Sequence, residues 1–224
     1  ELVYLVLPME KLSGTNIAAD SSTQGARYRF EENRLLDDSA EDGEEELLGL
    51  AHLNPRLKLG RDDLAGFACL SVARIVEVVN EKEVKLDRSF IPPTLDVAAV
   101  APLASFLREI LGMVKQRAKA LAVRMQKGAE QSSTLFDVLM LQTLNRWQPM
   151  LEHLKGAPQV HPERFYELAI TLTGELALFA RADKMVPSLP PYRHEQLTET
   201  FGDLAALLSQ SLSTVLEQTA IALK

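Results

Sequence analysis

The segment RSFIPPTLDVAAVAPLASFL, residues 88–107, decides how this chain divides. Pro92 and Pro93 each fix their own φ and push the preceding residue out of the helical region, so Phe90–Pro93 is predicted to be a stiff extended link. Pro102 suits the first turn of a helix, where its missing N–H would be unpaired in any case. We therefore expect a boundary near residues 90–95, with a long helix just after it.

Upstream of this link the hydrophobic period is two residues. Leu2–Leu7 is a short apolar run, Tyr28 and Phe30 alternate with charged residues, and Phe67–Val79 is rich in Val and Ile. This pattern is typical of antiparallel strands with one solvated face. Cys69 lies in the last run, and we expect it to be a small buried core residue instead of a nucleophile. Asn80-Glu81 is a possible hairpin turn.

Downstream of the link the period becomes three to four residues, which is typical of amphipathic helices. Pro149 is predicted to kink or end the second helix, and Trp147 to lie in a core or at a packed helix end. The four helical patterns begin near Pro102, Leu135, Pro162 and Glu195. The fold class predicted is α+β: an antiparallel β-sandwich segment in residues 1–91, then an up-down four-helix bundle in residues 92–224.

The charge is concentrated in one acidic stretch. Seven of the 31 acidic residues lie within residues 37–46, which leaves 24 acids against 24 bases elsewhere. A neutral body lacks the electrostatic footprint of a general nucleic-acid-binding protein. The stretch fails as a calcium loop because Ala40 and Gly49 stand where oxygen ligands are required, so a solvated loop between strands is predicted. No apolar run approaches the roughly 20 residues of a membrane span.

Motifs for catalysis, cofactors or metals are missing from the sequence. His194-Glu195 begins like a zinc-protease motif, but Thr198 stands in place of the second histidine. Each histidine is therefore expected at a helix start or on the surface. The single cysteine excludes an intramolecular disulfide and fits a reducing compartment. We predict no catalytic residue, no cofactor and no metal ligand; a hydrolase or phosphoryl-transfer enzyme with an unrecognised site is the disfavoured enzymatic alternative.

A basic stretch without acidic residues lies in the first helix. It contains Lys115, Arg117, Lys119, Arg124 and Lys127. Aromatic residues, on which the bases of single-stranded RNA stack, do not interrupt it. A solvated helix face or a partner contact is favoured. The alternative function is a regulatory helical-bundle module that binds RNA or another protein through residues 115–127.

Several short motifs, in a fixed order, resemble one protein family. They are Phe90-Ile91-Pro92-Pro93; Leu141-Gln142-Thr143-Leu144-Asn145-Arg146 with Pro149 and His153; His161-Pro162-Glu163 with Tyr166, then Gly174-Glu175-Leu176-Ala177 and Phe179; and Pro191-Tyr192 with His194, Leu197 and Phe201. Together with Leu5-Val6-Leu7-Pro8 upstream, their order and spacing are similar to those of the TssK family, the baseplate subunits of the bacterial type VI secretion system.

The resemblance implies a β-sandwich shell domain, a helical middle domain and a small C-terminal domain, assembled as a homotrimer in the cytoplasm beside the inner membrane. It implies a structural adaptor without catalysis, which joins the baseplate wedge proteins TssF and TssG to the membrane complex TssJ–TssL–TssM. It implies neither a nucleic-acid partner nor direct insertion into the membrane. We expect the start of the shell domain and the whole C-terminal domain, which docks on the membrane complex, to lie outside this sequence.

One set of residues is expected to form the helical core, with possible packing across the trimer. It consists of Leu107, Ile110, Val114, Leu144, Phe165, Leu172, Gly174, Leu176, Phe179, Phe201, Leu204 and Leu208. Gly174 stands in mid-helix, where glycine costs about 1 kcal/mol relative to alanine. We therefore expect it to admit another helix at close range, within the bundle or across the trimer.

Overall fold

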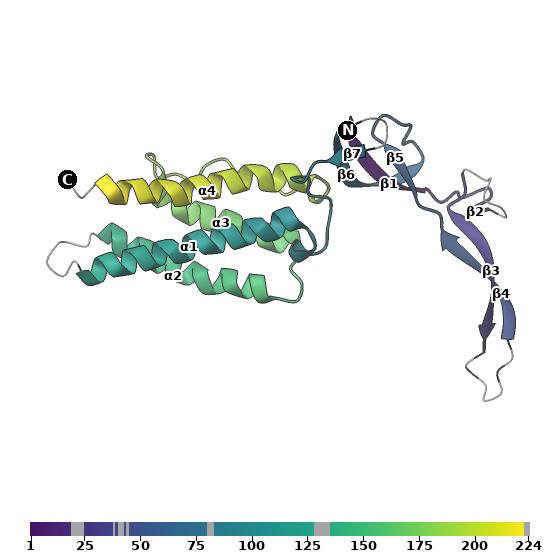
Figure 1. Cartoon of the computed structure of the whole chain (residues 1–224), viewed down its shortest axis with the longest axis horizontal. Helices are drawn as coiled ribbons and strands as arrows, with labels where there is room; N and C mark the ends of the chain where they lie inside the picture. Colours follow the sequence, from purple (N-terminus) through teal and green to yellow (C-terminus); the bar gives the residue numbers. More distant parts are fainter. Residues whose placement is uncertain are drawn as a thin grey trace. The chain divides into compact units, whose positions relative to one another are not determined.

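The chain divides into two compact units, Glu1–Asp87 and Arg88–Lys224, in a computed structural model (Figure 1). Residues 1–18, 25–37, 39, 43, 45–79, 83–127 and 135–221 are described, with side chains excepted at 127 and 214–221. The sequence predicts the division later, between residues 91 and 92. The link begins within the helical unit because Ile91 is buried there and its N–H donates to Thr198 Oγ1 at 2.8 Å.

A four-stranded antiparallel sheet forms one part of the first unit. Across the sheet its strands are β5 (Arg56–Leu59), β1 (Leu2–Pro8), β6 (Phe67–Val79) and β7 (Glu83–Leu86). On β1, Leu5 lies opposite both Leu57 and Leu70, so that three leucines share one face. The hairpin turn expected at Asn80-Glu81 lies outside the described residues.

The second sheet of this unit is a long hairpin with a short third strand. It contains β2 (Ile17–Ala18), β3 (Tyr28–Leu36) and β4 (Glu45–Leu53), with β2 parallel to β3 and β4 antiparallel to β3. Glu45 and Glu46 pair with β3, so the end of the predicted acidic loop is a strand. Asp38, Ala40–Asp42 and Glu44 of that loop lie outside the described residues.

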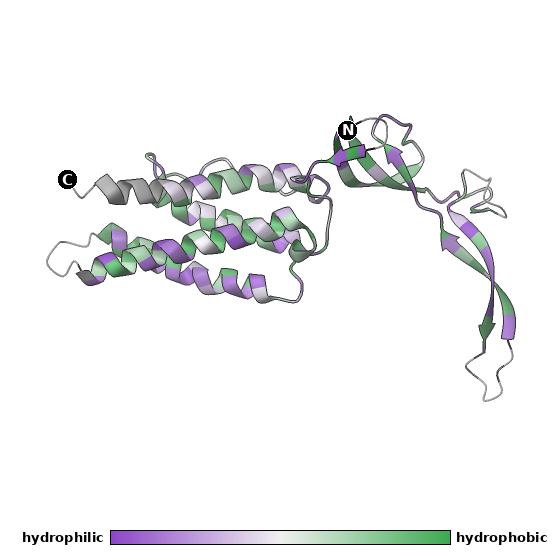
Figure 2. Ribbon diagram, viewed as in Figure 1, coloured by the Kyte–Doolittle hydropathy of each residue, from purple (hydrophilic) through white to green (hydrophobic). Residues whose placement is uncertain are grey.

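Both sheets expose large apolar side chains, among them Leu47, Leu57 and Val76. Figure 2 shows how hydrophobic residues recur along the strands. Among the described residues of Glu1–Asp87, the buried hydrophobic ones are Val6, Ala18 and Ala26. The α+β class is confirmed, but these residues do not bury the sheets against each other as a closed sandwich. The expectation that Cys69 is buried is wrong: it is exposed, because the described residues place no second layer over its side chain.

The second unit contains four long helices, preceded by the short turn η1 (Val97–Ala99). They are α1 (Ala101–Lys127), α2 (Leu135–Gly156), α3 (Pro162–Ala180) and α4 (Leu197–Ile221), the last preceded by η2 (His194–Gln196). Helix α2 continues through Pro149, whose ring is exposed, so of the two predicted effects, a kink or a helix end, the end does not occur. The helix ends at Gly156, as the sequence predicts.

The direction of α4 differs from the predicted up-down order. Phe106, Phe165 and Phe201 stand in the first turns of α1, α3 and α4, and their rings meet at centroid distances of 5.4–6.3 Å. These three helices therefore start at the same end of the bundle, while α2 runs the opposite way (Figure 1). Residues 181–193, here called the crossover, return along the bundle so that α4 can run parallel to α3.

All the apolar members of the set listed above lie in one buried cluster of the helical unit. Within this cluster the rings of Phe165 and Phe201 stack on each other, near the starts of α3 and α4. Gly174 is half-buried. Because the apolar members point into the bundle of their own chain, none of them is available to pack against another copy.

Candidate interaction surfaces of the helical unit

The family-like motifs, which are far apart in sequence, converge at two places in the helical unit. The first place is the end where α1, α3 and α4 begin. There the imidazoles of His161 and His194 stack with centroids 5.1 Å apart and planes 8° apart. Tyr192 packs against His194 with centroids 6.1 Å apart and against Tyr166 at 5.3 Å, and Tyr166 also meets Phe201 edge to face. We call His161, His194, Tyr166 and Tyr192 the ring cluster.

Hydrogen bonds tie the ring cluster to the crossover and join two of its own members. The Tyr166 hydroxyl donates to the carbonyl of Pro190, and the Tyr192 hydroxyl bonds His194 Nδ1 at 2.8 Å. Burial, and secondarily the carboxylate of Glu163, raise the pKa of Tyr192 to about 12, so its hydroxyl keeps its proton.

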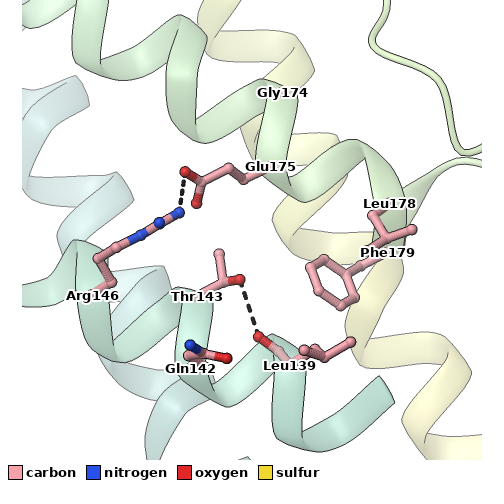
Figure 3. Close-up of a pocket in the computed structure, with 8 residues that line it drawn as sticks. All are labelled: Leu139, Gln142, Thr143, Arg146, Gly174, Glu175, Leu178 and Phe179. Atoms are coloured by element: carbon pink, nitrogen blue, oxygen red, sulfur yellow. Dashed lines mark hydrogen bonds and ion pairs between the residues drawn. The ribbon is translucent and has the colours of Figure 1, made fainter. Parts of the chain in front are cut away.

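The second place of convergence lies between α2 and α3. Glu175 on α3 accepts a 2.6 Å hydrogen bond from Trp147 Nε1. Its carboxylate also pairs with the guanidinium of Arg146, as Figure 3 shows. A buried indole N–H requires an acceptor, and an ionised one makes a short, strong bond. The sequence predicts a buried Trp147 but gives no signal for its partner, which lies one helix away.

A groove of about 430 Å³ opens beside the Arg146–Glu175 ion pair. It is lined by Leu139, Gln142, Thr143, Arg146, Gly174, Glu175, Leu178 and Phe179 (Figure 3). One end carries the Arg146–Glu175 pair and the other end carries Leu139, Leu178 and Phe179. The groove thus offers an apolar surface next to a fixed ion pair, without grouped acid, base and nucleophile side chains of the kind that catalysis needs.

The crossover begins just after the C-terminal end of α3 with a turn that is stabilised by hydrogen bonds to Asp183. Arg181 bonds both carboxylate oxygens of Asp183, at 2.9 and 2.7 Å, and this lowers the pKa of Asp183 to about 2. Asp183 also accepts the N–H of Met185, and Lys184 adopts φ 59°, which non-glycine residues seldom do. The turn holds Met185 and Val186 outward, 66% and 55% exposed.

The neighbour of Gly174 is this crossover. A Cβ placed on Gly174 would lie 3.7 Å from Val186 Cγ2, which is ordinary van der Waals contact, and no helix comes closer among the described residues. The expectation that Gly174 admits another helix of the bundle is therefore wrong. The spacing of motifs cannot reveal this, because the crossover's path depends on the parallel direction of α4.

The predicted basic face is not a free cationic surface. Arg117 is only 5% exposed, and burial lowers its pKa to about 10. Lys115 pairs with Glu152 at 2.7 Å, and Arg124 pairs with Asp137, both on α2. Within this basic stretch, and among its side chains that the structure describes, Lys119 alone is exposed and outside an ion pair. These contacts use the charges to join α1 to α2, which argues against RNA binding here.

Among the described residues, no three His, Cys, Asp or Glu side chains are grouped so that they could hold a metal ion. None of the described helices combines the length and apolar character needed to cross a membrane. His52 on β4 and His153 on α2 are exposed.

Comparison with known proteins identifies the class to which this architecture belongs. A family model described as bacterial type VI secretion, VC_A0110, EvfL, ImpJ, VasE matches residues 1–224. The chain belongs to this family.

The relatives carry the name TssK. The chain is 34% identical, over 99% of its length, to the type VI secretion system baseplate component TssK1 of Pseudomonas aeruginosa, and spans 50% of that relative. A TssK crystal structure matches 94% of the chain with a TM-score of 0.88 and 29% identity, again over 50% of the solved chain. A chain of a solved TssK-TssF-TssG baseplate subcomplex matches 95% of this chain, with a TM-score of 0.79 and 25% identity. The match covers 68% of that solved chain.

Proposed function

We propose that this protein is a structural adaptor subunit of a type VI secretion baseplate and that it works through protein–protein contacts without catalysis. The observation that carries the proposal is the likeness, over 95% of the chain, to the TssK subunit of a TssK-TssF-TssG subcomplex. On this proposal the longer protein lies in the cytoplasm. It binds its own TssF and TssG and links them to the TssJ–TssL–TssM membrane complex.

The sheet unit supports an adaptor role because it exposes apolar faces that need a cover. Leu5, Leu57 and Leu70 share one face of the four-stranded sheet and are 38%, 68% and 44% exposed. Soluble monomers rarely leave large contiguous apolar patches in water, and such patches mark protein contacts. We propose that this face belongs to the part of the shell domain that meets the wedge, and that the helical unit is the middle domain.

We propose that the longer protein is a homotrimer. The apolar residues first expected to pack across the trimer are buried inside one chain, so contacts between copies must use other positions. Leu178 lines the α2–α3 groove, is exposed and is suitable for such a contact. Light scattering should give the mass of three copies, and a strictly monomeric protein would contradict this part of the proposal.

Co-purification tests the adaptor role. The tagged longer protein, produced with TssF and TssG from the same system, should retain both through gel filtration. The double variant Leu57→Asp, Leu70→Asp should retain at least tenfold less wedge protein, whereas Lys119→Asp on α1 should bind like the wild type. If the wild type retains neither protein, the adaptor proposal is wrong. If the double variant melts at the wild-type temperature and binds fully, the sheet face is not the contact.

A further inference from the structure

We propose that the outer edge of β4 is an interface between two copies of this chain, in which the two β4 strands pair antiparallel about a two-fold axis at Gly49. The contact joins the hairpins of two copies into one sheet. It is independent of the adaptor role, and it is separate from the homotrimer proposed above. The proposal rests on the direction of the hydrogen-bonding groups of β4, on its sequence and on its exposed side chains.

The outer edge of β4 is open in the described part of the chain. There β4 pairs with β3 alone, and β2 covers the far side of β3 only at Tyr28 and Arg29. Most of the hairpin is therefore a two-stranded ribbon (Figure 1). Such a ribbon is marginally stable in water until a further strand or layer is added. A strand that pairs with β4 would supply this addition.

The ladder between β3 and β4 shows which backbone groups of β4 point outward. The Asn54 N–H donates to the Arg27 carbonyl at 2.9 Å, next to the Tyr28–Leu53 pair. Hydrogen-bonded and non-hydrogen-bonded pairs alternate in an antiparallel ladder, so the odd-numbered residues of β4 turn their N–H and C=O groups away from β3. These residues are Glu45, Leu47, Gly49, Ala51 and Leu53. They form a continuous row to which a second strand can bond.

The sequence of β4 does not protect this edge. Natural edge strands usually carry lysine, proline or a bulge, which prevents another strand from pairing with them. β3 has four charged residues within Arg29–Arg34, whereas Leu47–Leu53 of β4 has His52 as its one polar side chain. The register between the two strands also runs without a bulge. Of the two strands, β4 is therefore the one suited to pairing.

The best occupant of the edge is a second β4, because the strand complements itself. In antiparallel pairing about Gly49 all nine residues overlap, and Leu48 lies opposite Leu50 of the second copy. Glu46 lies opposite His52 of the second copy, with Arg29 one strand further on. Neither Glu46 nor Arg29 has an ion pair among the described residues. Parallel pairing would instead place the two acidic strand starts side by side, which is unfavourable.

The pairing also unites two exposed apolar surfaces. Leu47 and Leu53 are 60% and 54% exposed on the face of the hairpin that carries Phe30, itself 43% exposed. The Phe30 ring lies over Gly49, where a Cβ would come within 2.5 Å of Phe30 Cε2. An aromatic ring over a strand glycine covers the backbone that the missing side chain leaves bare. At the two-fold axis the two Gly49 residues can therefore meet without opposed side chains.

Sedimentation equilibrium of this chain at increasing concentration tests the contact. The wild type should reach the mass of two copies. Ala51→Pro removes one outward N–H and leaves the ladder to β3 intact, so it should weaken the dimer at least about tenfold. Glu32→Pro is the matched control, because Glu32 pairs with Gly49 and turns its own N–H to the opposite edge of the hairpin. This variant should dimerise like the wild type.

Disulfide formation tests the register. An equal mixture of Leu48→Cys and Leu50→Cys chains, both also carrying Cys69→Ser, should form linked dimers at least about tenfold faster than either variant alone. Opposite residues of a non-hydrogen-bonded pair lie about 4.5 Å apart at Cα, which a disulfide can span. If Ala51→Pro disrupts the hairpin, this mixture still decides the question.

Three results would overturn the proposal. The first is a wild type that shows only the mass of one or three copies at every concentration. The second is an Ala51→Pro variant that dimerises as strongly as the wild type. The third is cross-linking that is no faster in the mixture than in the separate variants. If the chain does not dimerise but Ala51→Pro in the longer protein reduces retention of TssF or TssG, another protein occupies the edge and the second copy is excluded.

Discussion

Replacement of Gly174 by alanine should stabilise the protein, and the sign of the effect tests how the crossover is packed. The added methyl group would sit 3.7 Å from Val186 Cγ2, close enough for van der Waals contact and too far for a clash. Alanine also restricts the unfolded chain and favours the helix by about 0.8–1.0 kcal/mol over glycine. We therefore expect a gain of about 0.5–1 kcal/mol, or roughly 2–4 °C in melting temperature.

Two other mid-helix glycines supply matched controls for this measurement. Gly112 on α1 and Gly202 on α4 have open space where a Cβ would be, so their alanine variants should gain a similar amount. Urea unfolding followed by circular dichroism measures all three. Gly174→Leu should lose stability, because its longer side chain must displace Val186. A loss for Gly174→Ala, with gains for Gly112→Ala and Gly202→Ala, would refute the reasoning and show that another chain packs on Gly174.

Three further predictions concern the same bundle. Leu172→Ala should cost about 2–5 kcal/mol in urea unfolding because Leu172 is 1% exposed, with exposed Thr171→Ala as the control; a loss below about 0.5 kcal/mol would show that the stripe is not core. In a double-mutant cycle, Trp147→Phe and Glu175→Gln should couple by about 1–3 kcal/mol, and additive losses would mean that their hydrogen bond contributes nothing. Because the pKa of Tyr192 is raised to about 12, its contribution is complete below pH 10 and falls as the pH rises toward 12, so the urea midpoint should drop more between pH 9 and 11 in the wild type than in Tyr192→Phe; equal drops would argue against this.

Hydrophobic period was sufficient to predict the α+β class and the helical core. Each α-helix buries one stripe, so a period near 3.6 residues marks the inward side chains whatever the direction of the neighbours. That is why Leu107, Phe165 and Leu204 are buried as expected. The direction in which each helix runs is not encoded in this periodicity. A parallel α4 requires a long return connection, and a chain read for period alone does not reveal where that connection runs.

The candidate surfaces were harder to predict because they depend on pairs that only tertiary structure brings together. His161 and His194 each looked like isolated surface residues, and nothing in their local sequence indicates that they stack. Likewise, Arg117 occupies the inward stripe between Val114 and Leu121, which spacing would assign to an apolar side chain. Cys69 was misjudged for the opposite reason: an apolar run predicts a strand, but burial depends on a second layer that the described residues do not provide.

The crossover has a consequence for how the newly made polypeptide acquires its structure. α1, α2 and α3 are joined by short connections and can assemble as they leave the ribosome, but α4 cannot fold back directly from α3. Its Phe201 must wait until residues 181–193 have been laid along the bundle, and until then Phe106 and Phe165 lack their third aromatic neighbour. Until α4 has been synthesised, the flank of α1 and α3 that it covers stays open to water, and exposed hydrophobic surface of this kind is what makes nascent chains prone to aggregate.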